Sequence, residues 1–261
     1  MDSSILVTGA ARRIGRQIAL TLAKAGYHIH LHYHQSEECA LQTRADILKN
    51  GGSASLIQAD LSDYQQVQDL VPKLGGLECP PLRHLVNNAS LFRDDNLFSL
   101  DAGSFQAHME VNLRAPLQLS RALYEALGEN DRGSIVNLID SSIFAMNPDF
   151  LSYSLSKYAL AGATEATAMA MAPRVRVNAV APGLTLLSGD QSEENFELTR
   201  HFNLNETACT PEDIARTVRH LIETPSFNAA VIPLDSGQKN LRMNRDVANI
   251  AEKYLNKGRP E

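Results

Sequence analysis

Cysteine is scarce in this sequence. Only three occur among the 261 residues, at Cys39, Cys79 and Cys209, and they are widely spaced without any C-x-x-C pair. This excludes a disulfide framework and argues against a structural zinc site. Free thiols of this kind are typical of a reducing compartment, so we expect a cytoplasmic protein.

Long apolar runs and blocks of basic charge are also missing. No stretch of about 18 apolar residues occurs, and the first apolar run is short and follows the acidic Asp2. Lys and Arg number 24 against 30 Asp and Glu, which gives a formal net charge of −6. We therefore expect neither secretion nor a membrane span, and no nucleic-acid partner.

Short apolar or β-branched runs alternate along the chain with longer stretches of helical periodicity. This alternation is typical of a parallel sheet covered by helices. The pattern predicts strands at residues 4–8, 28–33, 53–59, 83–87, 133–139, 174–181 and 229–234. It predicts helices at residues 13–26, 36–50, 63–74, 102–127, 150–172, 193–203 and 211–223. The expected fold is a single α/β domain over residues 1–261, a Rossmann-type doubly wound parallel sheet of about seven strands with helices on both faces.

One polar segment interrupts this rhythm at residues 184–210. It is rich in acidic and amide side chains and follows the end of an expected strand. Open α/β sheets bind ligands at the carboxyl ends of their strands. We therefore expect residues 184–210 to form a substrate-binding loop or lid.

The first expected strand runs into a glycine-containing turn that opens a helix. The turn contains Gly9, Arg12, Arg13, Ile14 and Gly15. Small residues at such a turn let the backbone approach a pyrophosphate, which the helix N-terminus attracts through its free N–H groups. The turn alone is equally compatible with a plain tight turn, because glycine turns after strands are common.

The second expected strand ends without an acidic residue. Sites that prefer NAD place a carboxylate at this point to bind the ribose 2′-hydroxyl. Here the strand ends in His34, Gln35 and Ser36, which can donate hydrogen bonds, and Arg12 and Arg13 lie in the turn. The sequence therefore predicts NADPH as the cofactor.

Four histidines alternate along the same strand, at His28, His30, His32 and His34. Alternate residues of a strand face one side, so a metal site has to be considered. No acidic or cysteine partner is close in sequence, and we expect these histidines to fill half-buried positions without a metal.

Tyr153 and Lys157 lie four residues apart on an expected helix, so their side chains share one face. Asp140 follows the fifth expected strand and should lie beside the tyrosine. A phenol is a poor acid at neutral pH, and a neighbouring ammonium brings its pKa toward the working range. The alternatives are a tyrosine with an ordinary hydrogen bond and an aspartate that caps the strand end.

Several ordered motifs together resemble the classical short-chain dehydrogenase/reductases. They are the turn at residues 8–15, Asp60-Leu61 after the third strand, Asn87-Asn88-Ala89 after the fourth, Asn112, Tyr153-x-x-x-Lys157, and Pro182-Gly183 after the sixth. The resemblance covers essentially the whole chain. It implies that Asn112 joins Asp140, Tyr153 and Lys157 in catalysis. It also implies that the cofactor is bound by Gly9, Arg12, Arg13, Ile14, Gly15, His34, Gln35, Ser36, Asp60, Leu61, Asn87, Ala89, Ser90, Tyr153, Lys157, Pro182 and Gly183.

Two departures from the common family pattern look like the pteridine reductases and the related dihydromonapterin reductases. Arg13 occupies a position where most members have a small residue, and Asp140 stands where most have a serine. The resemblance implies that Phe92 and the nicotinamide sandwich a flat pterin ring. The implied substrate-binding residues are Arg13, Ser90, Phe92, Asp140, Tyr153 and Leu184.

The favoured hypothesis is an NADPH-dependent reductase of pterins, acting on dihydrobiopterin, dihydromonapterin or dihydrofolate-like substrates. One alternative is a carbonyl reductase of the same fold, acting on a 3-oxoacyl thioester or a sugar. The other is a nucleotide-binding regulator that has lost catalysis. Small residues on several faces of the helix at 150–172 resemble the family's subunit interface, so we also expect a homotetramer.

Overall fold

Seven short apolar segments form one parallel sheet. The computed structural model describes residues 3–187 and 191–256. Within them the strands follow the order β3-β2-β1-β4-β5-β6-β7 and every neighbouring pair is parallel. The order reverses beside β1, so β1 and β4 flank the point where a doubly wound sheet opens for ligands. The strands are β1 (Ser4–Val7), β2 (His28–Tyr33), β3 (Ser53–Gln58), β4 (Leu82–Asn87), β5 (Gly133–Leu138), β6 (Val175–Pro182) and β7 (Val231–Leu234).

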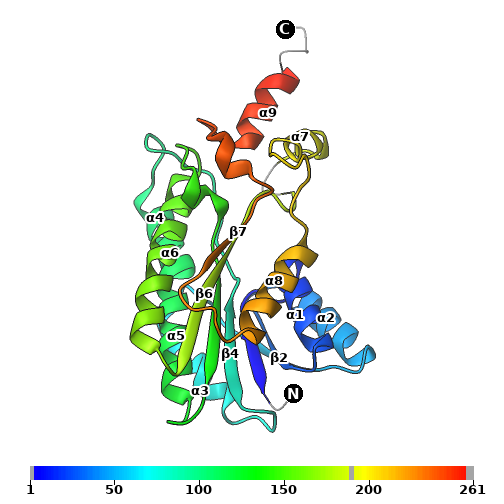
Figure 1. Ribbon diagram of the computed structural model, residues 1–261, viewed down its shortest axis with the longest axis vertical. Helices are drawn as coiled ribbons and strands as arrows, with labels where there is room; N and C mark the ends of the chain where they lie inside the picture. Colours follow the sequence, from blue (N-terminus) through cyan, green and yellow to red (C-terminus); the bar gives the residue numbers. More distant parts are fainter. Residues whose placement is uncertain (1–2, 188–190, 257–261) are drawn as a thin grey trace.

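Helices cover both faces of the sheet (Figure 1). One layer contains α1 (Arg13–Lys24), α2 (Glu37–Lys49) and α8 (Pro211–Glu223). The other contains α3 (Tyr64–Leu74), α4 (Ala102–Met109), α5 (Ala115–Ala126) and α6 (Leu151–Met171). The remaining helices, α7 (Glu193–Thr199) and α9 (Val247–Asn256), lie together beyond the carboxyl ends of the strands.

The two largest apolar clusters fix helices to the two faces of the sheet. On one face, Ile18 and Leu22 of α1 and Val218 of α8 are fully buried against strand residues such as Ile29. On the other face, Leu70 of α3 and Leu119 and Leu123 of α5 are buried against Leu85 and Ile135. Central strands that are buried on both faces have continuous apolar sequences, and these apolar runs located the strands well. The predicted seven-stranded fold is confirmed.

The helix expected at residues 102–127 is not continuous. A π-helical turn, Glu110–Arg114, separates α4 from α5. Pro116 stands in the first turn of α5 and has no N–H to donate to the carbonyl of Asn112. The regular ladder is therefore interrupted beside Asn112, and π turns of this kind are frequent at functional sites.

The end of the chain also differs from expectation. The helix expected at 193–203 ends at Thr199, and α9 was not predicted. Short 3₁₀ turns, Ser141–Phe144 and Gln238–Leu241, are likewise additional. Among the described residues, no helix combines the length and apolar character needed to span a bilayer.

Candidate active site

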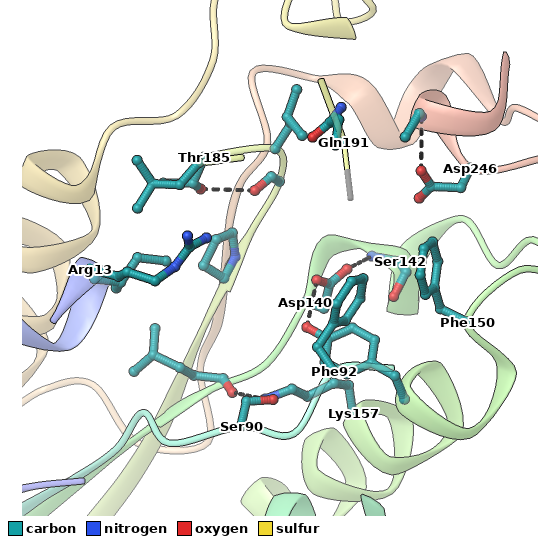
Figure 2. A pocket seen from close by; sticks show the side chains of 18 of the residues that line it. Arg13, Ser90, Phe92, Asp140, Ser142, Phe150, Lys157, Thr185, Gln191 and Asp246 are labelled. Atoms are coloured by element: carbon teal, nitrogen blue, oxygen red, sulfur yellow. Dashed lines mark hydrogen bonds between the residues drawn. The ribbon is translucent and has the colours of Figure 1, made fainter. Parts of the chain in front are cut away.

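A large cavity opens at the carboxyl ends of the strands. Its volume is about 1520 Å³, and its walls come from the glycine turn, the ends of β2, β4, β5 and β6, the start of α6, and the C-terminal segment before α9. In Figure 2, Arg13 approaches from the α1 side, while Asp140, Ser142 and Phe150 approach from the β5 and α6 side. The volume exceeds that of a typical small-molecule pocket, so a cofactor and a substrate fit together.

The glycine turn is built for close approach of a ligand to the backbone. Gly9 has a left-handed φ of +63°, and a Cβ on Gly15 would stand 2.1 Å from the carbonyl oxygen of Gly9. Asn88 holds the turn through its Nδ2, which donates to the oxygen of Thr8 at 2.8 Å. The first turn of α1 carries no acidic side chain, and no side chain caps its N-terminus. These residues fit a bound pyrophosphate.

His32 supports this turn from β2. Its Nδ1 accepts the N–H of Gly9 at 3.1 Å, and its Nε2 donates to the oxygen of Ala59 at 3.1 Å. Burial lowers the pKa of His32 to about 4, so the ring is neutral and can make both bonds at once. His32, one of the four alternating histidines, therefore connects the glycine turn to the end of β3 through two hydrogen bonds.

The end of β2 borders the cavity with polar side chains that carry no carboxylate. His34, Gln35 and Ser36 all line it. Asp60 lies outside the lining: its Oδ1 accepts the N–H and hydroxyl of Ser62 at 2.9 and 2.7 Å, and its Oδ2 faces His34 Nε2 at 3.6 Å. The Asp60 carboxylate is thus bound by the protein itself, and His34, Gln35 and Ser36 bring no carboxylate into the cavity that would repel a 2′-phosphate.

Asp140 and Tyr153 meet at the centre of the cavity. The Tyr153 hydroxyl donates to Asp140 Oδ2 at 2.9 Å, and Asp140 Oδ1 accepts the N–H of Ser142 at 2.8 Å. Asp140 therefore does cap the 3₁₀ turn after β5, and its second oxygen remains for the tyrosine. The two interpretations weighed for this aspartate, cap and reactive group, are compatible in one side chain.

Lys157 lies beneath the tyrosine. Its Nζ donates to the carbonyl oxygen of Leu138 at 2.8 Å and stands 5.6 Å from the centre of the Tyr153 ring. Burial lowers the pKa of Lys157 to about 8, while Asp140 opposes that shift. The ammonium thus remains the main form at neutral pH.

The expected lowering of the tyrosine pKa is wrong for this geometry. Burial, together with the charge of Asp140 and the hydrogen bond to it, raises the pKa of Tyr153 well above its ordinary value. Burial is the largest cause, and the hydrogen bond to Asp140 further stabilises the protonated phenol. Tyr153 is therefore held with its proton in place.

Asn112 holds the loop that follows β4. Its Oδ1 accepts the N–H of Leu91 at 2.7 Å, and its Nδ2 donates to the oxygen of Leu91 at 2.9 Å and to Ser156 Oγ at 3.0 Å. The Ser90 hydroxyl also reaches Asn112 Oδ1 at 3.3 Å. The amide is buried and fixes Ser90 and Phe92 at the cavity wall.

Phe92 is part of an aromatic cluster. Its ring stacks on Phe150 with a centroid distance of 4.5 Å and an interplanar angle of 25°, and it meets the Tyr153 ring edge-on at 4.7 Å. Phe150 has a left-handed φ of +51° at the start of α6. Phe150 already covers one face of Phe92, so a flat substrate could stack only on the opposite face.

Arg13 links the phosphate turn to the expected lid. The backbone of Arg13 has a left-handed φ of +55°, and its guanidinium donates to the carbonyl oxygen of Leu187 at 2.7 Å. Leu184 lines the cavity, and its oxygen accepts the N–H of Cys209 at 3.2 Å. Part of the expected lid, residues 188–190, lies outside the described residues. Beyond it, α7 is tied to α9 by a bond from Asn195 Nδ2 to the oxygen of Ala248 at 2.9 Å.

Most residues expected in the site do line the cavity. Those that do are Gly9, Arg12, Arg13, Ile14, Gly15, His34, Gln35, Ser36, Leu61, Ala89, Ser90, Phe92, Asp140, Tyr153, Lys157, Pro182, Gly183 and Leu184. Asp60, Asn87 and Asn112 do not. Asn87 is buried in β4 and donates to Asn137 Oδ1 at 2.8 Å. Its neighbour Asn88 lines the cavity in its place.

Sequence reasoning missed the part of the cavity wall that the C-terminal segment forms. Its acidic residues there are Asp246 and Glu252, which we call the acidic wall. Arg245 forms an ion pair with the buried Asp149 at 2.7 Å, and Asp149 also accepts the N–H of Asp246 at 2.8 Å. Burial raises the pKa of Asp246 to about 6. The helical spacing of Val247, Ile250, Ala251 and Tyr254 after an aspartate is the signal that could have located this segment.

Known proteins with related sequences and structures were found over nearly the whole chain. The short chain dehydrogenase family model matches residues 3–197. A 3-oxoacyl-[acyl-carrier-protein] reductase of Synechocystis sp. is 33% identical over 223 residues, which cover 85% of this chain and 89% of that protein.

Two crystal structures extend the likeness to the whole fold. FolM alternative dihydrofolate reductase 1 from Brucella canis, complexed with NADP, is 40% identical with a TM-score of 0.87, over 91% of this chain and 94% of that one. A short chain dehydrogenase from Burkholderia cenocepacia, also in complex with NADP, is 31% identical with a TM-score of 0.83, over 91% and 98%. Likeness of this extent in sequence and in fold shows that the chain is an oxidoreductase belonging to the short chain dehydrogenase family.

Proposed function

We propose that the protein is an NADPH-dependent reductase of pterin- or folate-type substrates. The observation that carries this proposal is the hydrogen bond from Tyr153 to the Asp140 carboxylate at 2.9 Å. A carboxylate beside the tyrosine suits a donor-rich, planar heterocycle better than a simple carbonyl. The 40% identity to a FolM alternative dihydrofolate reductase supports the same substrate class.

The residues of the glycine turn and the end of β2 fit NADPH. Gly9, Gly15 and the start of α1 would receive the pyrophosphate, and Gln35 and Ser36 would face the ribose of the adenosine. When bound, the cofactor supplies a hydride from its nicotinamide ring. The complexes of related proteins with NADP support this choice of cofactor.

Tyr153 would supply the proton that reduction of a C=N bond requires. Its raised pKa keeps the hydroxyl protonated at neutral pH, and its hydrogen bond to Asp140 fixes the hydroxyl at the cavity wall. Lys157 stabilises the negative charge left on the phenol oxygen during transfer. Solvent in the open cavity then returns a proton to the tyrosine, either directly or by way of the Asp140 carboxylate that is hydrogen-bonded to it.

Phe92 and the acidic wall would hold the substrate ring. The face of Phe92 away from Phe150 offers a stacking surface, and Ser90 and Arg13 stand at the cavity wall. Pterins carry amino and ring N–H donors, and Asp140 and Asp246 offer carboxylate oxygens to such groups. The described parts of the 184–210 segment, with α7 packed against α9, would cover the substrate tail.

A carbonyl reductase is the second candidate. The 33% identity to a 3-oxoacyl-[acyl-carrier-protein] reductase over most of both chains favours it. The two activities share the cofactor site, the tyrosine and the lysine. They differ in what lies beside the tyrosine, and this is why the Asp140 carboxylate decides between them.

The test is NADPH consumption with a panel of substrates at equal concentration. Dihydrobiopterin, dihydromonapterin and dihydrofolate represent the first candidate, and an acetoacetyl thioester the second. We expect kcat/KM for the best pterin to exceed that for the thioester at least about 100-fold, which corresponds to roughly 2.7 kcal/mol in transition-state binding. A thioester preferred over every pterin would overturn the proposal, and no turnover of any of them would favour a nucleotide-binding regulator.

A further inference from the structure

A second cluster of reactive side chains lies at the amino ends of the strands, on the side of the sheet opposite the cavity. His28 and His30 come from the start of β2, and Cys79 lies in the loop between α3 and β4. One donor atom from each of the three side chains falls within 4.8 Å of the other two. Cys79 is 49 residues from His30 along the chain, which explains why the sequence offered no cysteine partner for the histidines.

In both histidines the Nδ1 atom makes the shorter hydrogen bond, in each case to a serine of β3. His28 Nδ1 meets Ser53 Oγ at 2.7 Å, and His30 Nδ1 meets Ser55 Oγ at 2.7 Å. If each Nδ1–H donates to its serine, each Nε2 carries a lone pair. Metal-bound histidines are commonly oriented in this way, by a hydrogen bond from the ring nitrogen that does not bind the metal.

The Nε2 atoms make the longer contacts of each ring. His28 Nε2 reaches Ser55 Oγ only at 3.3 Å, while His30 Nε2 faces both Ser4 Oγ at 2.9 Å and Cys79 Sγ at 3.8 Å. Zn–S and Zn–N bonds of about 2.3 and 2.0 Å at a tetrahedral angle separate S and N by about 3.5 Å. The observed Sγ–Nε2 distance of 3.8 Å is therefore close to the separation of two ligand atoms in a tetrahedral zinc site.

His28 and His30 are buried and Cys79 is partly buried, so the three side chains lie beneath the protein surface. Imidazole and thiolate together select Zn²⁺ over Mg²⁺ or Ca²⁺, which prefer oxygen.

We propose that His28, His30 and Cys79 form a binding site for one Zn²⁺ ion, with water or the Ser4 hydroxyl as the fourth ligand. Binding forms two Zn–N bonds and one Zn–S bond, and the Cys79 thiol releases its proton to solvent. No oxidation or reduction takes place. The ion would connect the loop before β4 to the start of β2, at the amino ends of the strands and far from the cavity at their carboxyl ends. It would therefore affect stability and not hydride transfer.

Cobalt substitution gives the most specific test. Protein freed of metal with a chelator is titrated with Co²⁺, and we expect a saturable thiolate-to-cobalt charge-transfer absorption, stoichiometric with the chain and abolished by Zn²⁺. Cys79→Ser should lose the band, and His30→Gln should weaken Co²⁺ binding at least about 10-fold. Cys39→Ser is the matched control, because Cys39 is an exposed thiol on α2 and should leave the band intact.

Thermal unfolding supplies a second readout. Zn²⁺ should raise the Tm of the wild-type and Cys39→Ser proteins but not that of Cys79→Ser, while pterin turnover stays unchanged in all three. The absence of a charge-transfer band, or a band that survives Cys79→Ser, would overturn the proposal. The cluster would then be a hydrogen-bonded network of histidines and serines only.

Discussion

Asp140 changes what the neighbouring tyrosine can do. Its carboxylate accepts the hydrogen of the Tyr153 hydroxyl at 2.9 Å, and burial together with this charge raises the tyrosine pKa. A serine at this position would bring no negative charge. The chain positions of Asp140, Tyr153 and Lys157 could be predicted, because the helical spacing and the strand end are visible in sequence. The direction of the tyrosine pKa shift could not, since it depends on how deeply the hydroxyl is buried and on its hydrogen bond to Asp140.

Removing the Tyr153 hydroxyl should remove most of the catalysis. For Tyr153→Phe we expect kcat to fall about 100-fold or more, because general acid catalysis contributes 10²–10⁴-fold. NADPH affinity, measured by fluorescence titration, should change little. Tyr158→Phe is the control on the same helix, since Tyr158 is exposed and does not line the cavity. Wild-type turnover by Tyr153→Phe would show that another group donates the proton.

At the scale of the elements, the strand ends determine where the site forms. The carboxyl ends of β1, β2, β4, β5 and β6 converge on one cavity, and the strands themselves could be predicted to within about two residues from their apolar runs. The π turn beside Asn112 and the helix α9 were not predicted. The first depends on one proline inside a good helical pattern, and the second on a segment whose apolar face is covered by α7, distant in sequence.

The end of β2 should set the choice of cofactor. We expect NADPH to be preferred over NADH, and Gln35→Asp should reduce that preference about 10-fold, which corresponds to roughly 1.4 kcal/mol of repulsion between the new carboxylate and a 2′-phosphate. The measurement is the ratio of kcat/KM for the two cofactors. Gln68→Asp adds the same charge on the exposed surface of α3 and should leave the ratio unchanged. Equal use of NADH and NADPH by the wild type would contradict the assignment.

At the scale of the whole molecule, imidazoles of the sheet should make stability sensitive to acid, and the half-buried His84 of β4 is one of three whose pKa is lowered to about 4, with His30 and His32. Burial lowers the pKa of His84 to about 4, against 6.5 in the unfolded chain, and Arg176 and Arg83 act in the same direction. Between these values the unfolded chain binds more protons, so stability falls as pH falls from about 6.5 toward 4.

Urea unfolding at pH 7 and pH 5 measures this effect. We expect His84 to account for a loss of stability on the order of 1–2 kcal/mol between the two pH values. His84→Asn keeps a polar group near Ser134, its hydrogen-bond partner at 3.0 Å, and should show a shallower pH dependence than the wild type. The same pH dependence in both proteins would rule His84 out as its source.

We also propose that the molecule assembles with copies of itself, as a homotetramer. The outer face of α6 exposes Leu155, Tyr158 and Met169, and nothing lies within 4 Å of a Cβ built on Gly162. Small and apolar residues on one helix allow a second helix to approach closely. Light scattering at micromolar concentration should give a mass several times 28.6 kDa. A monomer at that concentration would be inconsistent with the assembly.

The most direct test of the substrate assignment is the variant Asp140→Ser, assayed on dihydropterin and on an acetoacetyl thioester. Losing a charge-assisted hydrogen bond costs about 1.5–3 kcal/mol, so we expect kcat/KM for the pterin to fall roughly 10- to 150-fold while the thioester rate is unchanged or rises. The melting temperature should stay close to that of the wild type. A folded Asp140→Ser protein that reduces pterin within a few-fold of the wild-type rate would contradict the account.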